Sequence, residues 1–258
     1  MLFKPYAKIL VLALILLAFS SCSATQNTGP APLRVGITPE FPPMIFLSGG
    51  WVAGVEVDLA RLLGQKLERP VQFIPVDWTD QIPALLAGKT DIIMSSMTIT
   101  QPRKVRINFT DPYFKSGLLA MMRAEDTPKY KSREDVAQSF ATIGVVGGTT
   151  GDVFVQQNFP NSRKISLSKS GDAPSELKRR SIDIFVYDGP TIMWLVSQNE
   201  ADFVAINKPL NEEFLAWGVG RDDEALLATV NKILADWKRD GTLSRLLKRW
   251  LPYMDFFK

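Results

Sequence analysis

The sequence predicts an α/β protein built from two lobes, each a mainly parallel sheet covered by helices. Strand-like apolar segments alternate with amphipathic helical segments, and this alternation restarts in the second half of the chain. The 258 residues suffice for two lobes of about 100 residues each. Apolar residues make up 46% and charged residues 22%, which is ordinary for a globular protein and excludes a largely disordered chain.

The chain begins with a segment that is typical of an export signal. Lys4 and Lys8 flank the start of an apolar run at 9–19. A helix of that length extends about 16 Å, too short for a hydrocarbon layer of about 30 Å. We therefore expect residues 1–21 to be a secretory signal peptide.

The only cysteine, Cys22, follows two serines at the end of this run. This arrangement resembles the lipobox of bacterial lipoproteins, although Phe19 stands where Leu is usual. The resemblance implies lipidation of Cys22, and the polar segment that follows makes 22–32 a lipidated residue plus flexible tether. An ordinary signal peptide with an incidental thiol is the alternative.

The first half of the mature chain alternates strands and helices. The segment 33–37 (LRVGI) alternates and then meets Pro39, Pro42 and Pro43, which favours a strand followed by a rigid loop. Apolar residues recur at helical spacing over 57–67. Further along, we predict strands at 71–75 and 91–94 and a helix at 81–87.

The second half repeats this pattern. Strands are predicted at 117–122, 142–146, 182–186 and 214–219, and helices at 152–157, 175–180 and 191–198. Two amphipathic helices, at 226–237 and 243–250, complete the chain, with Gly241 between them. Two lobes that are joined by strands would hinge about them, and a ligand would lie in the crevice at the strand ends.

Composition excludes several classes of function. Histidine is absent and cysteine occurs once, which excludes imidazole catalysis, histidine-containing zinc sites and an intrachain disulfide. The net charge of +3 is too small, and the basic residues too dispersed, to indicate nucleic-acid binding. We expect no metal and no cofactor.

The most informative stretch follows the predicted strand 91–94. It carries hydroxyls and one guanidinium at the carboxyl end of a strand, namely Ser95, Ser96, Thr98, Thr100 and Arg103. An arginine binds a carboxylate through two parallel hydrogen bonds, and hydroxyls can donate to the same oxygens. These residues favour a carboxylate receptor; a Ser/Thr-rich turn with a solvated arginine is the alternative.

Other candidates lie at other strand ends. The glycine-rich segment 147–151 precedes a helix and could favour an anion, without a complete nucleotide-binding motif. Asp188 follows a strand and could receive an ammonium group or cap the helix after it. Phe41 and Trp78 could clamp a small ligand or belong to the core.

Together these residues resemble the family 3 extracellular solute-binding proteins, the polar amino-acid receptors of ABC importers. The resemblance covers nearly all of 33–250. It is carried by FPP at 41–43, GVEVDL at 54–59, WTDQIPAL at 78–85, SSMTITQPR at 95–103, FTDPY at 109–113, GVVGGTT at 144–150, DIFVYD at 183–188 and WKRDGTL at 237–243.

The resemblance implies the two-lobed type II periplasmic-binding-protein fold with two hinge crossings. Lobe 1 would comprise 33–117 and 214–258, and lobe 2 would comprise 118–213. In the family, the position of Arg103 holds the ligand α-carboxylate and that of Asp188 the α-ammonium. The hydroxyls at the positions of Ser96, Thr98 and Thr150 would help to hold the carboxylate. The aromatic rings at the positions of Phe41 and Trp78 would sandwich the ligand side chain. Many relatives with cationic or amide ligands carry an acid in the first loop where this chain has Thr38, and Glu40 is displaced from that position by two places. The resemblance therefore leaves the identity of the bound side chain open.

The resemblance therefore implies a monomeric, non-enzymatic receptor that captures an amino acid or similar zwitterion between closing lobes. It would deliver the ligand to an ABC permease from the periplasmic or extracellular face of the envelope, anchored through Cys22. Two alternatives stay open: an enzyme on the same fold, such as a lyase similar to cyclohexadienyl dehydratase, and a sensor that is independent of transport.

Overall fold

A computed structural model describes residues 29–206 and 208–253 of the chain. By internal contacts the chain divides into Met1–Ala31 and Pro32–Lys258, and the helices and strands of the described residues all belong to the second unit. The expected signal peptide and Cys22 lie outside the described residues.

The first sheet has the order β5-β1-β6-β15-β7. Its strands are β5 (Val71–Pro75), β1 (Leu33–Ile37), β6 (Ile92–Ile93), β15 (Gly218–Val219) and β7 (Asn108–Phe109). β5, β1 and β6 run parallel, and β15 is antiparallel to both β6 and β7. One strand is thus reversed among four that share a direction.

The second sheet repeats this arrangement in the order β11-β10-β12-β9-β13. Its strands are β11 (Arg163–Leu167), β10 (Thr142–Val146), β12 (Ile184–Asp188), β9 (Leu118–Arg123) and β13 (Phe203–Ala205). Here β9 is the reversed strand, antiparallel to β12 and β13. The two mainly parallel sheets confirm the predicted α/β, two-lobed class.

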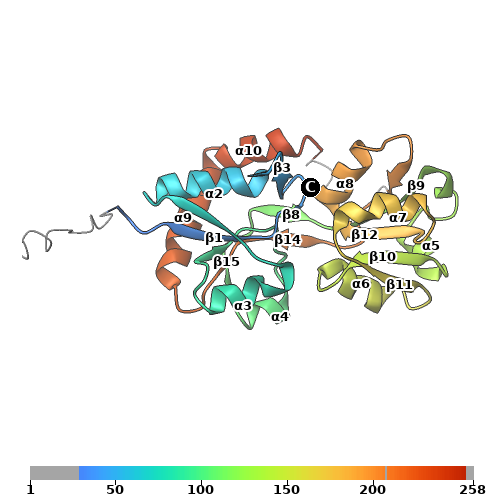
Figure 1. The fold of residues 1–258 in the computed structure, drawn as a ribbon, viewed down its shortest axis with the longest axis horizontal. Coiled ribbons are helices and arrows are strands. Elements are labelled where there is room, and N and C mark those ends of the chain that lie inside the picture. Colours follow the sequence, from blue (N-terminus) through green and yellow to red (C-terminus); the bar gives the residue numbers. More distant parts are fainter. Residues whose placement is uncertain (1–28, 207, 254–258) are drawn as a thin grey trace, which may run out of the picture. The chain divides into compact units, whose positions relative to one another are not determined.

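A two-stranded ribbon connects the sheets. β8 (Phe114–Ser116) pairs antiparallel with β14 (Glu213–Leu215), and both run between the two halves of the molecule (Figure 1). The reversed strands β9 and β15 follow directly on these two crossing segments. Each crossing therefore enters its sheet against the direction of the other strands.

Helices flank both sheets. Beside the first lie α2 (Val55–Lys66), α3 (Gln81–Leu86), α9 (Glu224–Arg239) and α10 (Thr242–Trp250), and beside the second lie α5 (Arg133–Gln138), α6 (Thr150–Asn158), α7 (Ala173–Lys178) and α8 (Gly189–Ser197). Figure 1 shows α2 above and α3 below the first sheet, and α7 above and α6 below the second. Among 29–206 and 208–253, no helix has both the length and the apolar character to cross a membrane.

The strand centres form the core of each lobe. Val35, Ile37 and Ile92 of the first sheet and Ile143 and Ile184 of the second are fully buried. These strands are nearly continuous apolar runs, as expected where helices cover both faces of a sheet. The third strand in the order of each sheet, β6 and β12, can therefore place charged groups only at or beside its two ends.

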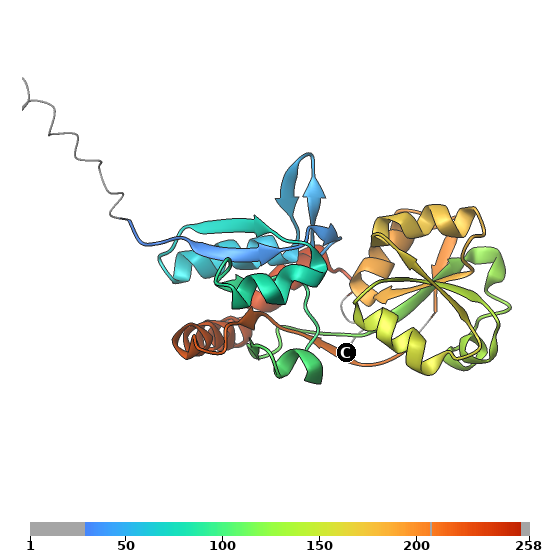
Figure 2. The same cartoon turned by 60° about the horizontal axis from the view of Figure 1, so that its bottom comes forward.

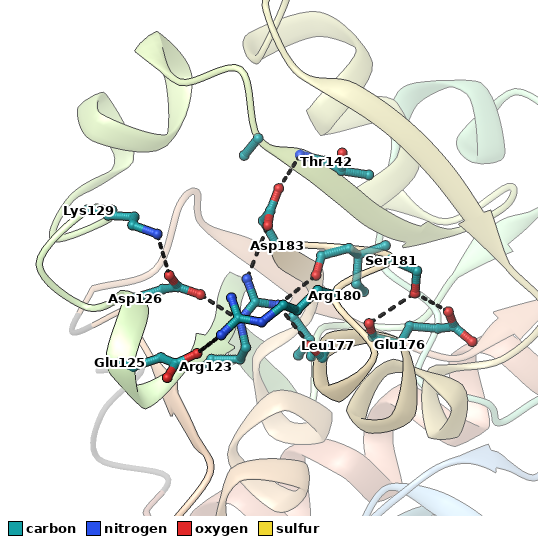
Figure 3. Close-up of polar contacts among 12 residues, drawn as sticks. Arg123, Glu125, Asp126, Lys129, Thr142, Glu176, Leu177, Arg180, Ser181 and Asp183 are labelled. Atoms are coloured by element: carbon teal, nitrogen blue, oxygen red, sulfur yellow. Dashed lines mark hydrogen bonds and ion pairs between the residues drawn. The ribbon is translucent and has the colours of Figure 1, made fainter.

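An aspartate stands at the start of this third strand in both sheets. The backbone N–H of Arg34 in β1 donates to Asp91, and that of Thr142 in β10 donates to Asp183, each at 2.9 Å. In the second sheet the buried Arg123 adds a network (Figure 3). Its Nε donates to Asp126 at 2.6 Å and its Nη2 to Asp183 at 3.1 Å. These contacts fasten the end of the sheet opposite the candidate site.

Among the differences from the sequence expectations, two concern segments beside the first sheet. The segment 214–219 forms two short strands, β14 and β15, rather than one, because the chain leaves the crossing ribbon before it joins the first sheet. A small three-stranded antiparallel sheet of β2 (Glu40–Phe41), β3 (Ile45–Ser48) and β4 (Trp51–Ala53), seen projecting in Figure 2, lies where we predicted only a loop. Its strands are too short and too exposed to give a clear alternating pattern.

Candidate functional site

Arg103 is fixed by the turn that carries it. The short helix α4 (Gln101–Lys104) starts at Thr100, whose Oγ1 accepts a hydrogen bond from the Arg103 N–H at 3.4 Å. The Arg103 Nη1 donates to the Thr98 carbonyl at 2.8 Å. The guanidinium carbon lies 5.0 Å from the centre of the Trp78 ring, within the range of a cation–π contact. Arg103 is therefore held before any ligand arrives.

The aromatic candidates contact one another. The Phe41 and Trp78 rings pack edge to face with centroids 5.4 Å apart, and Phe41 also lies 6.0 Å from the ring of Tyr187. The Trp78 Nε1 donates to the carbonyl of Gly148 at 3.0 Å. Gly148 has a φ of 72°, a left-handed conformation that favours glycine. A sandwich of these rings around a ligand stays a prediction.

Asp188 ends β12 and stands at the amino terminus of α8, but its side chain makes no capping hydrogen bond. Burial and the neighbouring charge of Glu213 raise the pKa of Asp188 to about 7, and the charge of Arg103 acts to lower it. Burial lowers the pKa of Arg103, which the two carboxylates oppose. Among the described residues, Arg103 and Asp188 form no direct ion pair, so they act on each other across a gap.

Glu213 is a site residue that the sequence analysis missed. It is 5% exposed at the first position of β14. Its Oε2 accepts a hydrogen bond from the Thr98 hydroxyl, and its Oε1 accepts one from the Asn211 amide, both at 3.1 Å. An acidic residue entering an apolar strand was the available signal, but the adjacent Glu212, which is exposed, gives the same signal.

A cavity of about 570 Å³ opens beside Arg103. Three of the predicted binding residues, Thr98, Arg103 and Thr150, line it together with Glu213. Thr150 is the first residue of α6, and the preceding Thr149 caps that helix by accepting from the Asp152 N–H at 3.4 Å. Both threonines line the cavity, but the hydroxyl of Thr149 is already engaged by the helix cap.

Ser96 is positioned by a second residue that the sequence analysis missed. Ser96 has a φ of 55°, which is unfavourable for a residue with a side chain, and its N–H donates to Glu56 Oε1 at 2.8 Å. Tyr113 and Trp217 also donate to this fully buried carboxylate, at 2.7 and 2.9 Å. Burial raises the pKa of Glu56 to about 7 in spite of these bonds. Helical spacing from Glu56 to the apolar Ala60 and Leu63 could have revealed its burial.

Thr38 follows directly on β1. It is buried, and its hydroxyl donates to the Val76 carbonyl at 2.8 Å and accepts from Gln81 at 2.9 Å. The side chain therefore serves the packing of the first lobe. Among 29–206 and 208–253, no group of carboxylates or thiols is arranged to hold a metal ion.

The structure thus brings the predicted residues into one region with unequal roles. Arg103, Thr98 and Thr150 share the cavity, and Trp78 and Phe41 form a chain of ring contacts from Arg103 to Tyr187, the neighbour of Asp188. Ser96 and Asp188 do not line the cavity. Ser96 belongs to the same loop as Arg103. Asp188 acts on the site through its charge, because Asp188 and Arg103 each shift the pKa of the other.

The family model of the bacterial extracellular solute-binding proteins, family 3, matches residues 33–253. The chain belongs to this family. Family 3 relatives include the "ABC transporter arginine-binding protein 1" of Escherichia coli strain K12, which is 28% identical over 95% of this chain and 99% of its own.

Solved structures of other proteins share the fold. A binding component of an ABC transporter from Wolinella succinogenes, complexed with lysine, has a TM-score of 0.82 at 29% identity, over 85% of this chain and 95% of its own. The ancestral amino acid-binding protein AncCDT-1, described as a precursor of cyclohexadienyl dehydratase, has a TM-score of 0.79 at 31% identity, over 88% of this chain and 96% of its own.

Proposed function

We propose that this family 3 protein is a receptor that captures a free amino acid between its two lobes and delivers it to an ABC permease. Arg103 binds the α-carboxylate and Asp188 the α-ammonium. The observation that carries this proposal is the pairing of two partly buried opposite charges that sense each other without a direct ion pair. A zwitterion that lies between them satisfies both charges at once.

Lobe closure is the second part of the proposal. We assign 33–117 and 214–258 to lobe 1 and 118–213 to lobe 2, with the β8–β14 ribbon as the hinge. Side-chain hydrogen bonds that join the lobes so defined include Trp78 Nε1 to the Gly148 carbonyl at 3.0 Å, the Ser170 hydroxyl to the Glu40 carbonyl at 2.9 Å, and the Tyr253 hydroxyl to the Pro190 carbonyl at 3.0 Å. Because Arg103 and Asp188 come from different lobes, a bridging ligand stabilises the closed form through contacts that the open form lacks.

The family relation supports transport as the purpose of binding. Named relatives are binding proteins of ABC transporters, for arginine in one case and glutamine in another. When the two lobes close on the ligand, the surface of the protein changes, and a membrane permease can therefore distinguish the closed form from the open form. We further propose that Cys22 carries a lipid anchor at the outer face of a membrane and that the protein acts as a monomer. Mass spectrometry of the mature protein and of a Cys22→Ser variant tests the anchor: a diacylglyceryl adduct on the first alone is expected, and an unmodified thiol contradicts it.

A binding role fits the site better than catalysis. A lyase similar to cyclohexadienyl dehydratase would need to accept a dicarboxylate and supply a proton. Asp188, with a pKa near 7, could hold a proton, but Asp188 and Glu213 would both repel a second ligand carboxylate. Incubation of the protein with prephenate or arogenate is expected to leave both unchanged.

The proposal is tested by a thermal-shift screen of the twenty amino acids followed by calorimetry. A specific ligand raises the melting temperature in proportion to the logarithm of its concentration over its Kd. We expect Arg103→Ala and Asp188→Ala each to reduce affinity by roughly 10- to 150-fold, the range for a charged hydrogen bond of about 1.5–3 kcal/mol. Unchanged affinity in both variants would overturn the proposal.

A further inference from the structure

The charges at the candidate site do not balance. Arg103 is the only cation among the cavity-lining residues that the structure describes, whereas Glu213 and the nearby Asp188 are both acids that act on it. Glu212 also lines the cavity, but it is exposed and forms an ion pair with Lys115 at 2.6 Å. One guanidinium thus faces two carboxylates.

Neutral groups hold Glu213 in place without cancelling its charge. The hydroxyl of Thr98 and the amide of Asn211 each donate to one of its oxygens at 3.1 Å. The carboxylate is 5% exposed, so water offers it little screening. Its charge is therefore felt inside the cavity.

The α-groups of an amino acid leave this imbalance unchanged. The ligand carboxylate pairs with Arg103 and the ligand ammonium pairs with Asp188, which adds no net charge. The carboxylate of Glu213 then remains without a cationic partner in a water-poor cavity, an arrangement that proteins avoid. A second cationic group on the ligand would remove the imbalance.

We propose that Glu213 is a specificity-determining residue and that the cavity beside Arg103 receives a cationic ligand side chain, an amine or a guanidine. The inference rests on the proposed function and adds the class of amino acid. The ligand side chain would lie in the cavity, and its α-carboxylate and α-ammonium would lie between Arg103 and Asp188.

The lining of the cavity suits such a side chain. Because an ionised carboxylate can only accept, the Thr98 hydroxyl must donate its hydrogen to Glu213. The Thr98 hydroxyl oxygen can then still accept a hydrogen bond from a cationic group of the ligand. Gln157 adds a further amide to the wall, and Val153 and Phe154 offer apolar surface to a methylene stem. The wall therefore combines acceptors for a cation with contact for an aliphatic chain.

The test compares ligands that differ only in charge. L-arginine and L-citrulline have nearly the same shape, but the terminal group of citrulline is a neutral urea; L-lysine and L-norleucine form a second pair. Calorimetry at pH 8 would measure all four with the wild-type protein, Glu213→Gln and a control, Glu134→Gln. Glu134 is exposed on α5 and does not line the cavity.

We expect the wild-type protein to bind the cationic member of at least one pair at least about tenfold more tightly, the smaller effect of a charged hydrogen bond. Glu213→Gln should bring the two members of that pair within about threefold, and Glu134→Gln should keep the preference. A wild-type protein that binds citrulline as tightly as arginine and norleucine as tightly as lysine overturns the inference and leaves the proposed function standing.

A preference that persists in Glu213→Gln also overturns the role of Glu213. If that variant does not fold, as judged by circular dichroism, the wild-type comparison decides the side-chain class. If the wild-type protein binds no amino acid at all, the proposed function fails and the inference fails with it.

Discussion

The hydroxyl of Thr98 donates a hydrogen bond of 3.1 Å to the carboxylate of Glu213, 115 residues away in the sequence. The same residue, Thr98, accepts through its carbonyl from Arg103 at 2.8 Å. One threonine therefore sets the position of a cation and of an anion on the same cavity wall. It can do so because the loop pairs with the crossing strand, where the Ile99 N–H donates to the Phe214 carbonyl at 2.9 Å.

Thr98→Val keeps the size of the side chain and removes the hydroxyl. Glu213 then loses one of its two donors while buried, which should lower the free energy of unfolding by about 1–3 kcal/mol. Thr98→Ser retains the hydroxyl and should lose less than half as much. Urea denaturation of the two variants measures this, and equal stabilities would show that the bond to Glu213 does not matter.

Ligand affinity should depend on pH through Asp188. Its pKa of about 7 in the free protein means that below pH 7 a proton must leave before an ammonium can bind. The association constant should rise about tenfold per pH unit between pH 5 and 7 and level off above, with one proton released per ligand bound at pH 6. Calorimetry in buffers of different ionisation enthalpy counts that proton. Asp188→Asn should bind weakly and without this pH dependence, whereas an unaltered profile would exclude Asp188 as the ammonium partner.

Folding stability should depend on pH through Glu56. Its pKa is raised from 4.5 to about 7, so the folded state holds a proton that the unfolded state releases earlier. Stability from this group is therefore highest at low pH and is lost as the pH rises towards 7. From pH 5 to pH 8 the loss amounts to about 2–3 kcal/mol.

Glu56→Gln removes that contribution, although it also removes an acceptor from Ser96 and Tyr113 or from Trp217. Urea unfolding at pH 5 and pH 8 should show the wild-type protein losing about 2–3 kcal/mol more than the variant. Parallel pH profiles for the two proteins would mean that Glu56 does not titrate in this range.

The bonds between the lobes should contribute to ligand retention. Trp78→Phe keeps an aromatic ring beside Arg103 but loses the bond to the Gly148 carbonyl, and Ser170→Ala loses the bond to the Glu40 carbonyl. Each variant should weaken binding by roughly 2- to 10-fold, mainly through faster dissociation, as expected for one neutral hydrogen bond. Stopped-flow fluorescence measures the rates. Ser170 does not line the cavity, so an effect in Trp78→Phe alone would point to a local role of the ring instead of closure.

Strand periodicity and turn residues were sufficient to predict the architecture. Three predicted strands, 33–37, 71–75 and 142–146, have the bounds of β1, β5 and β10. Pro32 and Pro70 precede the first two strands and Gly147 follows the third, so local sequence marks one end of each. The edge strands β11 and β13 were missed, because half-exposed strands carry a weak pattern.

The candidate site was predictable only where one motif carries it. Arg103 and its hydroxyl neighbours lie in one loop, so their proximity follows from the sequence. Glu213 comes from the crossing strand β14 and Glu56 from helix α2, both distant in sequence from the loop of Arg103. Neither acid stands in a motif that indicates a binding role. Their roles arise from tertiary contacts, with Ser96 for Glu56 and with Thr98 for Glu213, and no local sequence pattern predicts those contacts.

The central claim is that one amino acid lies between Arg103 and Asp188. A crystal structure of the protein with the tightest ligand of the amino-acid screen tests it most directly. The account predicts the α-carboxylate within about 3 Å of the Arg103 guanidinium and the α-ammonium within about 3 Å of the Asp188 carboxylate. A ligand whose α-groups contact neither residue would contradict it.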